Sequence, residues 1–243
     1  MNFTYSEFTD KGDREINEDA VGYCSSERGK CFVLCDGLGG HGMGDIASSL
    51  VVDVFRSSFP DCRIIKNFLA ETFVSAQDIL CAEQIKKNAK RKMKTTCVAV
   101  VTDDKHAYIG HIGDSRAYVF YKNKIVKRTL DHSIPQMLVF SKEIKESEIR
   151  YHPDRNMLLK VMGTEWLERD YEIQKPIPLK RCQAILLCSD GFWELIEEDT
   201  MCELLEKATD VNDWMKKMTD TVKDNGKSVD MDNFSAVAVW IKK

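Results

Sequence analysis

The fold of this chain is decided by the stretch Cys31-Phe32-Val33-Leu34-Cys35-Asp36-Gly37-Leu38-Gly39-Gly40-His41-Gly42. Its five leading apolar residues predict a short buried strand, and the Asp-Gly pair then turns the chain into a glycine-rich loop. Such a strand would deliver a carboxylate at the end of a rigid element, and the glycines beside it would let other groups approach closely. One such aspartate means little, because Asp-Gly is also common in ordinary turns.

The same arrangement recurs along the chain, because several other apolar segments begin or end at an acidic residue. These acids are Glu18 and Asp19 before segment 20–24, Asp114 after segment 107–112, Asp190 after segment 183–188, and Asp232 before segment 233–241. Strands that share one sheet system could bring these carboxylates to a common rim. We therefore treat the acids as one candidate site.

Length and composition favour a single domain in a reducing compartment. The chain has 243 residues, 43% of them hydrophobic, which is enough for one good core, and we expect one domain over residues 1–243. Most of the nine cysteines stand inside apolar runs, which is typical of small core residues and not of a disulfide framework. A zinc site at Cys31 and Cys35 is disfavoured, because no second pair stands at zinc spacing.

The remaining bulk properties bound the partners. The sequence shows no signal peptide and no run of the ~20 apolar residues that a membrane helix needs, so we expect a cytoplasmic protein with no membrane partner. A net charge of −4 gives no general attraction to nucleic acid. The basic run 86–94 could hold an acidic or phosphorylated partner, but we favour a solvated helix end with cations near its C-terminus.

The pattern of apolar residues predicts an α+β fold. Strands are expected at residues 3–9, 20–24, 31–35, 95–102, 107–112, 116–121, 124–129, 169–175, 183–188 and 233–241. Helices are expected from about Met43 to Phe59, from about Cys62 to Lys90, and near 198–208 and 211–224. Residues 133–162 are polar and irregular and read as a lid or flap. Short turns between strands favour antiparallel hairpins covered by helices.

If the strand-end acids converge, their mutual repulsion must be relieved. Two unit charges about 4 Å apart repel by about 4 kcal/mol at an effective dielectric near 20. Several such pairs would consume much of the ~5–15 kcal/mol by which a domain is stable. Protonation or neighbouring cations would relieve the repulsion, but only Arg14 and Arg116 stand in these motifs. Divalent metal ions are therefore the favoured solution.

Oxygen ligands and an arginine together indicate phosphoester hydrolysis. All-oxygen sites select hard ions such as Mg²⁺ or Mn²⁺. Two such ions roughly 3.5–4 Å apart would hold and acidify a water between them. Arg14 lies four residues before Glu18 and could offer its guanidinium fork to a phosphate. A structural calcium site stays open as an alternative, although no segment matches the EF-hand loop.

The chain resembles the metal-dependent serine/threonine protein phosphatases of the protein phosphatase 2C type, and more closely the compact bacterial members than the animal ones. The resemblance spans nearly the whole length, and the order of its motifs makes it specific. The matching pieces are Asp10-Lys11-Gly12-Asp13-Arg14-Glu15-Ile16-Asn17-Glu18-Asp19, Asp36-Gly37-Leu38-Gly39-Gly40-His41, Thr95-Thr96, Gly113-Asp114-Ser115-Arg116, Leu130-Asp131-His132-Ser133, His152-Pro153-Asp154-Arg155-Asn156, Ser189-Asp190-Gly191 and Asp232-Asn233-Phe234-Ser235.

The resemblance implies a four-layer αββα sandwich, with two antiparallel sheets flanked by helix pairs and two Mn²⁺ or Mg²⁺ ions in a cleft at one edge. It also implies a role for each candidate residue. Asp36 would bridge both ions, Glu18 and the Gly37 carbonyl would bind one of them, and Asp190 and Asp232 would bind the other. Asp114 would hold a weaker third ion together with Asp190. Asp19 would act through metal-bound water, and Arg14 would bind the phosphate. Residues 133–162 would form the flap over the cleft, where substrate choice is thought to lie.

Three departures from the family pattern matter. Many animal members place a histidine directly after the Asp-Gly pair as a candidate general acid, but Leu38 stands there in this chain. His41 follows three residues later and is at least as well explained as a loop histidine bonded to backbone. Lys94 precedes the threonine pair where a glycine is usual. The flap also lacks the glycine expected around 140–142.

The sequence thus predicts hydrolysis of phosphoserine and phosphothreonine in proteins by a metal-bridging hydroxide, with no phosphoenzyme intermediate. Expected partners are phosphorylated proteins, including a serine/threonine kinase or its substrates, and a monomer is expected. Two alternatives stay open: a catalytically silent module that binds phosphoproteins, and a phosphatase for small phosphomonoesters. A serine-hydrolase mechanism at Ser115 or Ser189 is disfavoured, because no histidine base stands at a recognisable spacing.

Overall fold

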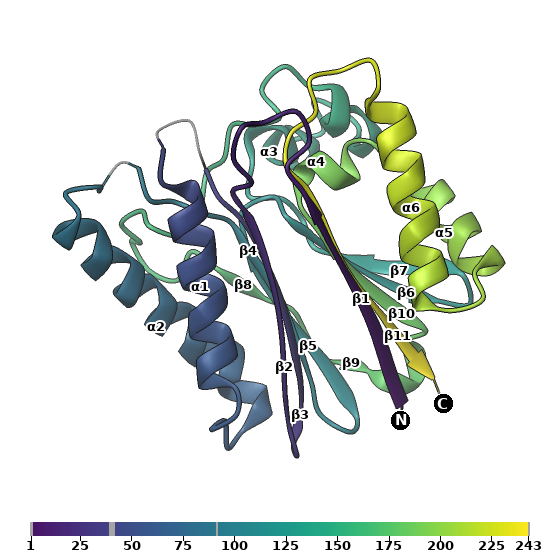
Figure 1. Cartoon of the computed structure of the whole chain (residues 1–243), viewed down its shortest axis with the longest axis horizontal. Coiled ribbons are helices and arrows are strands. Elements are labelled where there is room, and N and C mark those ends of the chain that lie inside the picture. The colour runs from purple at the N-terminus through teal and green to yellow at the C-terminus, as the bar shows by residue number, and fades with distance from the viewer. Residues whose placement is uncertain (1, 39–41, 91, 243) are drawn as a thin grey trace.

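Two antiparallel β-sheets stack face to face, and a pair of helices covers the outer side of each sheet (Figure 1). The computed structural model describes residues 2–38, 42–90 and 92–242. This arrangement confirms the predicted four-layer α+β sandwich. The two ends of the described chain lie next to each other, because Asn2 pairs with Lys242 across two neighbouring strands.

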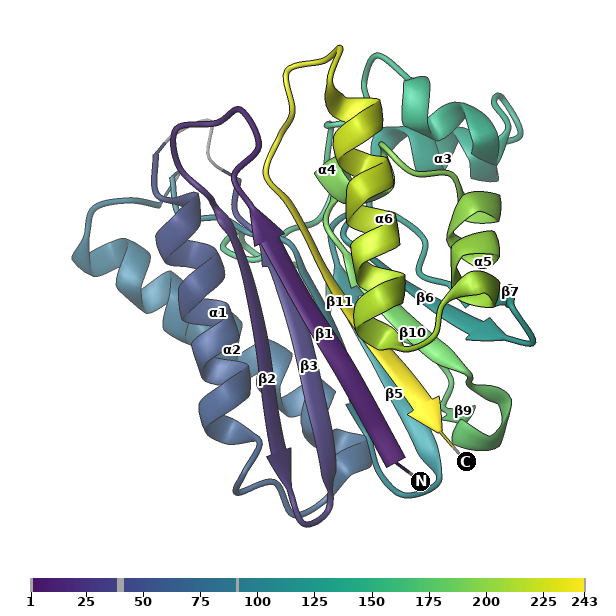
Figure 2. The ribbon, with the colours of Figure 1, turned by 45° about the vertical axis from the view of Figure 1, so that its right-hand side comes forward.

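The strands divide into two sheets that draw on distant parts of the sequence. The first sheet has the order β1 (Asn2–Asp10), β11 (Phe234–Lys242), β10 (Ala184–Cys188), β6 (Arg116–Tyr121), β7 (Lys124–Arg128). The second has the order β2 (Asp19–Ser26), β3 (Gly29–Asp36), β4 (Cys97–Thr102), β5 (His106–Ile112), β8 (Glu172–Ile173), and β9 (Ile177–Pro178) also pairs with β5. Figure 2 shows β1 and β2, neighbours in sequence, lying in different sheets.

Four long helices lie on the outer faces of the sheets, and two short ones, α3 (Ile134–Phe140) and α4 (Asp190–Trp193), lie near one end of the strands (Figures 1 and 2). The long α-helices are α1 (Gly44–Ser58), α2 (Ile65–Lys86), α5 (Glu198–Lys207) and α6 (Val211–Gly226), and the 3₁₀ helices are η1 (Glu146–Tyr151) and η2 (Leu179–Arg181). Helices α1 and α2 cover the second sheet, while α5 and α6 cover the first (Figures 1 and 2). Asp210 caps α6 by accepting hydrogen bonds from the backbone N–H groups of Asn212 and Asp213.

Three apolar layers hold the sandwich together, and β3 belongs to two of them. Cys31, Val33 and Cys35 point toward α1 and α2, whereas Phe32 and Leu34 point toward the other sheet. Because both of its faces are buried, β3 reads as a continuous apolar run in the sequence instead of an alternating one. The five cysteines that stand inside apolar runs are buried, as their reading as core residues predicted: Cys31, Cys35, Cys97, Cys182 and Cys188.

Antiparallel pairing explains why the acids alternate between the end and the start of a strand. In β2 and β3, Asp19 at the first strand's start lies opposite Asp36 at the second strand's end. In β10 and β11, Cys188 pairs with Ala236, so Asp190 after one strand lies near Asp232 before the other. Neighbouring antiparallel strands run in opposite directions, and so the acids reach the same edge.

Several predicted elements differ from the observed ones. Helix α2 ends at Lys86 and not at Lys90, and the buried side chains of Ala89 and Met93 tie down the basic run that follows it. The expected strand 169–175 is only the two-residue β8, with β9 after it. The hairpins predicted at the turns 103–105 and 122–124 are observed as β4–β5 and β6–β7, whereas β5 and β6 lie in different sheets. The loop that crosses between the sheets carries Asp114.

Within the described ranges, none of the helices combines the length and the apolar character needed to cross a membrane.

Candidate active site

A cavity of about 620 Å³ opens where the ends of both sheets meet. It gathers residues from the start of the chain, from the loops after β3, β5 and β10, from the flap and from the start of β11. Its described lining is Arg14, Glu15, Ile16, Glu18, Asp36, Gly37, Leu38, Gly42, Asp114, Asn156, Leu158, Asp190 and Asp232. Every predicted metal ligand is in this lining, as is the predicted phosphate-binding arginine. Asp19 is not, and it lies buried behind the cavity wall.

Two glycines allow Glu18 to reach the cavity. The Glu18 carboxylate accepts hydrogen bonds from the backbone N–H groups of Gly44 and Asp45 at the start of α1, where a helix favours negative charge. A Cβ atom on Gly37 would lie 2.3 Å from the Gly44 carbonyl oxygen, and one on Gly44 would lie 2.8 Å from a Glu18 carboxylate oxygen. Only glycine at both positions permits this approach of loop, helix and carboxylate.

Asp36 stands at the centre of the acids. Its backbone is held by the next strand, because its N–H donates to Thr96 Oγ1 (3.1 Å) and its carbonyl accepts from Thr95 Oγ1 (2.8 Å). Burial raises the pKa of Asp36 well above its ordinary value, and the charges of neighbouring aspartates and a hydrogen bond to Asp190 raise it further. Two carboxyls held this close are stabilised by a proton or a cation between them.

Asp19 is buried directly behind Asp36, with 9% of its surface exposed. Burial raises the pKa of Asp19 to about 7, although the hydrogen bond that Ser189 donates to its carboxylate opposes the rise. Ser189 Oγ donates to Oδ2 at 2.8 Å, whereas Oδ1 finds no hydrogen-bond partner among the described residues. A buried carboxylate oxygen left in this way is suited to a bound water or ion.

Asp114 enters the cavity from the loop that joins the two sheets. It is 4% exposed, and burial raises the pKa of its carboxyl well above the usual value, with the charges of Asp190 and Asp131 adding to the effect. The Trp193 indole N–H donates to the Asp114 backbone carbonyl at 3.1 Å. This bond gives Trp193 a role in holding the loop that carries Asp114.

Arg14 lines the cavity, but its guanidinium group is already paired with Asp232. Its Nε and Nη2 donate to the two carboxylate oxygens of Asp232 at 3.0 and 3.1 Å, and Nη1 lies 3.5 Å from Asp230. Arg14 is the one cationic side chain among the described residues that line the cavity. One guanidinium cannot neutralise the acids around it, and Asp190 also keeps a raised pKa because of burial and the Asp232 charge.

The residues present fit hard divalent cations. Carboxylates and a backbone carbonyl converge from several loops, which is the oxygen donor set that Mg²⁺ and Mn²⁺ prefer. The raised pKa values of the acids and the unsatisfied Asp19 oxygen are the expected signs of a cluster from which positive charge is missing. Electrostatics thus supports the same conclusion as the sequence pattern.

Sequence reasoning missed two contributors to the site. Asn233 was quoted only as part of a motif, yet its Oδ1 accepts from the Glu18 N–H (2.7 Å) and its Nδ2 donates to the carbonyls of Lys11 and Ile16. It therefore ties the loop before β2 to the start of β11. The flap supplies Asn156 and Leu158 to the lining. The signal that could have identified Asn233 is its position directly after Asp232, at the start of the predicted strand 233–241.

The predicted departures have mixed outcomes. Leu38, which stands where many animal members place a histidine, lines the cavity. His41 lies outside the described residues. In the flap, Lys142 adopts a left-handed backbone with φ of 64°, which is the conformation that the missing glycine would favour. Ser115 is buried with Oγ 2.7 Å from Thr96 Oγ1, and so it is a structural hydroxyl.

Comparison with known proteins places the geometry in context. Residues 11–234 match the family model described as protein phosphatase 2C. The serine/threonine phosphatase stp of Listeria monocytogenes is 31% identical over 214 residues, which cover 83% of each chain. The crystal structure of the serine/threonine phosphatase Stp1 from Staphylococcus aureus superposes with a TM-score of 0.89 at 31% identity and covers 100% of this chain and 96% of that one. The catalytic domain of PstP, solved in complex with two manganese ions, gives a TM-score of 0.81 at 23% identity, with 99% of each chain covered.

Proposed function

This chain belongs to the protein phosphatase 2C family and is a metal-dependent serine/threonine protein phosphatase, and we propose that the acidic cavity at the sheet edge is where it hydrolyses phosphoserine and phosphothreonine. The observation that carries the assignment is the convergence of Glu18, Asp36, Asp114, Asp190 and Asp232 in one cavity, with Arg14 beside them.

We propose that two Mn²⁺ or Mg²⁺ ions occupy this cavity, with a weaker third. Asp36 would bridge the first two, Glu18 and the Gly37 carbonyl would serve one of them, and Asp190 and Asp232 the other. Asp114 would hold the third together with Asp190. When bound, such ions neutralise the acids and activate the attacking water. The related PstP structure with two manganese ions supports the number of ions.

The side chains of this chain would divide the remaining work. Asp19 is positioned to accept a hydrogen bond from water through Oδ1, while Ser189 holds its other oxygen in place. Arg14 would turn its fork from Asp232 to the phosphate once Asp232 is otherwise engaged, because both carboxylates and phosphates accept two parallel N–H donors. Leu38 cannot donate a proton, so another group must protonate the leaving alkoxide, and we propose that water does so.

We also propose that residues 1–243 are one catalytic domain with a flap at about 133–162. The pairing of both chain ends in one sheet supports this proposal. Nine free thiols support a reducing compartment, and we propose the cytoplasm. The substrates would be phosphorylated proteins, including a serine/threonine kinase or its targets, and the protein would act as a monomer.

One assay tests the assignment of the site. Wild type should release phosphate from a phosphothreonine peptide in the presence of Mn²⁺, and less from the matched phosphotyrosine peptide. Asp36→Asn should lower this turnover by roughly 100-fold or more, because loss of a metal ligand removes the ions it holds. Asp53→Asn, on the exposed side of α1, is the control and should match wild type. Unchanged activity of Asp36→Asn would refute the site.

The same peptides separate the alternatives. A silent phosphoprotein-binding module would bind the phosphothreonine peptide without releasing phosphate. A phosphatase for small phosphomonoesters would hydrolyse nucleotides faster than the peptide. In ¹⁸O-labelled water, direct attack should place one labelled oxygen in the released phosphate, and trapping of a covalent phosphoprotein would contradict a mechanism without a phosphoenzyme.

A further inference from the structure

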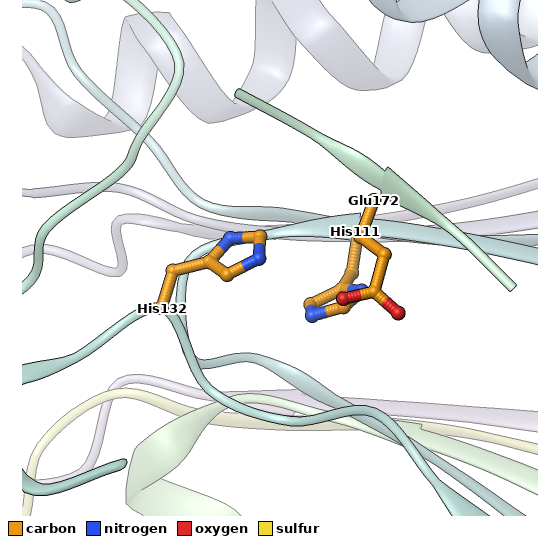
Figure 3. Close-up of side chains that lie close together, drawn as sticks. All are labelled: His111, His132 and Glu172. Atoms are coloured by element: carbon orange, nitrogen blue, oxygen red, sulfur yellow. The ribbon is translucent and has the colours of Figure 1, made fainter. Parts of the chain in front are cut away.

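We propose that His111, His132 and Glu172 form a second metal site, selective for Zn²⁺-like ions and separate from the carboxylate cavity. His111 lies near the end of β5, His132 in the loop before α3, and Glu172 in β8. One ligand atom from each residue lies within 4.8 Å of the others. Figure 3 shows the three side chains turned toward a common space from three separate segments.

His111 is the anchor of this site. Its side chain is fully buried, and Nε2 lies 2.7 Å from the Leu130 carbonyl oxygen, so Nε2 carries the proton and donates it. The other ring nitrogen, Nδ1, is buried and finds no hydrogen-bond partner among the described residues. A metal-binding histidine typically donates its second ring N–H to a carbonyl in this way, which orients the lone pair of the first nitrogen toward the ion.

Glu172 supplies the oxygen ligand of the proposed site and lies on the side that faces solvent. It pairs directly with His111 in the register between β5 and β8, and its side chain is exposed at the sheet edge. An ion could therefore enter from solvent, and water could complete its coordination. Two imidazoles and one carboxylate suit Zn²⁺, whereas Mg²⁺ and Mn²⁺ prefer the all-oxygen cavity. The two sites would thus take different ions.

His132 must move for the ion to bind. Its ring now stacks on His111 with centroids 4.6 Å apart and planes 18° from parallel, so the in-plane lone pairs run side by side. Nδ1 of His132 accepts a 3.2 Å hydrogen bond from the Gly113 N–H, which leaves Nε2 as its ligand atom. Rotation about the Cβ–Cγ bond would release this long bond and turn Nε2 toward the ion, and the proton of Nε2 would move to the freed Nδ1.

The alternative is that the two rings are a packing feature and bind nothing. The two readings differ in measurable metal binding. The full chain is first saturated with Mg²⁺ to occupy the carboxylate cavity, and Co²⁺ is then titrated as a coloured substitute for Zn²⁺. We expect one further equivalent of Co²⁺, with the visible absorption of a four-coordinate nitrogen and oxygen site.

Two variants and two matched controls decide the assignment. His132→Ala and Glu172→Gln should each weaken this Co²⁺ binding by roughly 10-fold or more. His106→Ala, at the opposite end of β5, and Glu168→Gln should bind Co²⁺ as wild type does. Glu172→Gln changes an exposed side chain and should keep the fold, so its result is independent of folding. The proposal is overturned if wild type binds no such equivalent, or if both site variants bind Co²⁺ as tightly as wild type.

Discussion

Two groups of acids contact the surroundings of Trp193, and they differ in how far positive charge balances them. The first group is the cavity acids, beginning with Asp114, whose carbonyl accepts from the indole N–H. In the second group the Arg116 guanidinium lies 3.4 Å from the centre of the indole ring and pairs with Asp131 at 2.7 Å. The nearby Glu198 carboxylate accepts from Arg150 at 2.8 Å.

The difference separates function from structure. Burial and like charges raise the pKa values of the cavity acids, so that group is incomplete without added positive charge. In the second group, burial raises the pKa of Glu198 but the charges of Arg150 and Arg116 outweigh it, and its pKa is lowered. The cavity beside this second group is the larger, at about 970 Å³, yet the arginines that line it are already paired with acids. Unrelieved charge, and not cavity size, marks the proposed active site.

The largest expected effect is a loss of stability when the buried ion pair between Arg116 and Asp131 is removed. Arg116→Met should destabilise the protein by about 3–5 kcal/mol, because it removes both short bonds to the buried Asp131 carboxylate and leaves only the 3.4 Å bond from Arg128. Chemical denaturation would measure this loss. Arg116→Met combined with Asp131→Leu should recover much of it. A single variant as stable as wild type would show that the ion pair is not what keeps this group buried.

An activity change of about 10-fold is expected at the cation of the cavity. Arg14→Ala should raise the KM for a phosphopeptide by about 10-fold, or about 1.4 kcal/mol, while the Mn²⁺ requirement changes little. Steady-state kinetics at saturating Mn²⁺ would test this. Arg28→Ala, at the far end of β2 and β3, is the control. If the Mn²⁺ requirement changed and KM did not, Arg14 would serve the metal ligands and not the phosphate.

The two groups should also respond to pH in opposite directions. A lowered pKa means that Glu198 stabilises the fold above its unfolded value of 4.5 and loses this contribution as pH falls through its folded pKa. Glu198→Gln should therefore cost about 1–2 kcal/mol near pH 7, a modest value because the carboxylate is partly exposed. The cost should decrease as the pH falls below 4.5 and through the lowered pKa of Glu198. Unfolding free energies across this range would reveal it, and a cost that stayed constant would contradict it.

The smallest effect is expected at the residue that contacts both groups. Trp193→Phe keeps the packing but removes the N–H bond to the Asp114 carbonyl, at a cost of about 1 kcal/mol. We expect the Mn²⁺ concentration for half-maximal activity to rise by about 5-fold, close to 1 kcal/mol. Trp214→Phe removes a similar bond, to the Met201 carbonyl, and should lose stability without changing the Mn²⁺ response. Equal Mn²⁺ responses in both variants would contradict the claim that the bond from Trp193 to the Asp114 carbonyl supports Mn²⁺ binding.

The sequence predicted the acids of the site better than their surroundings. Apolar runs that end or begin at Asp36, Asp190 and Asp232 signal buried strands in a local stretch of chain, and antiparallel pairing then brings their ends together. The crossing from β5 to β6 was not predictable, because a short loop between two strands favours a hairpin. The burial of Asp19 and the engaged fork of Arg14 depend on partners more than 160 residues away in sequence.

Thermal unfolding of the wild type and Asp36→Asn, each with and without Mn²⁺, tests the central claim most directly. An asparagine at this position cannot ionise and can still donate to Asp190. We predict that metal-free Asp36→Asn melts at a higher temperature than metal-free wild type, and that Mn²⁺ raises the melting temperature of the wild type alone. Saturation at 100 times the dissociation constant would contribute about 2.7 kcal/mol. Equal melting temperatures without metal, together with no response of the wild type to Mn²⁺, would contradict the claim that these acids require divalent ions.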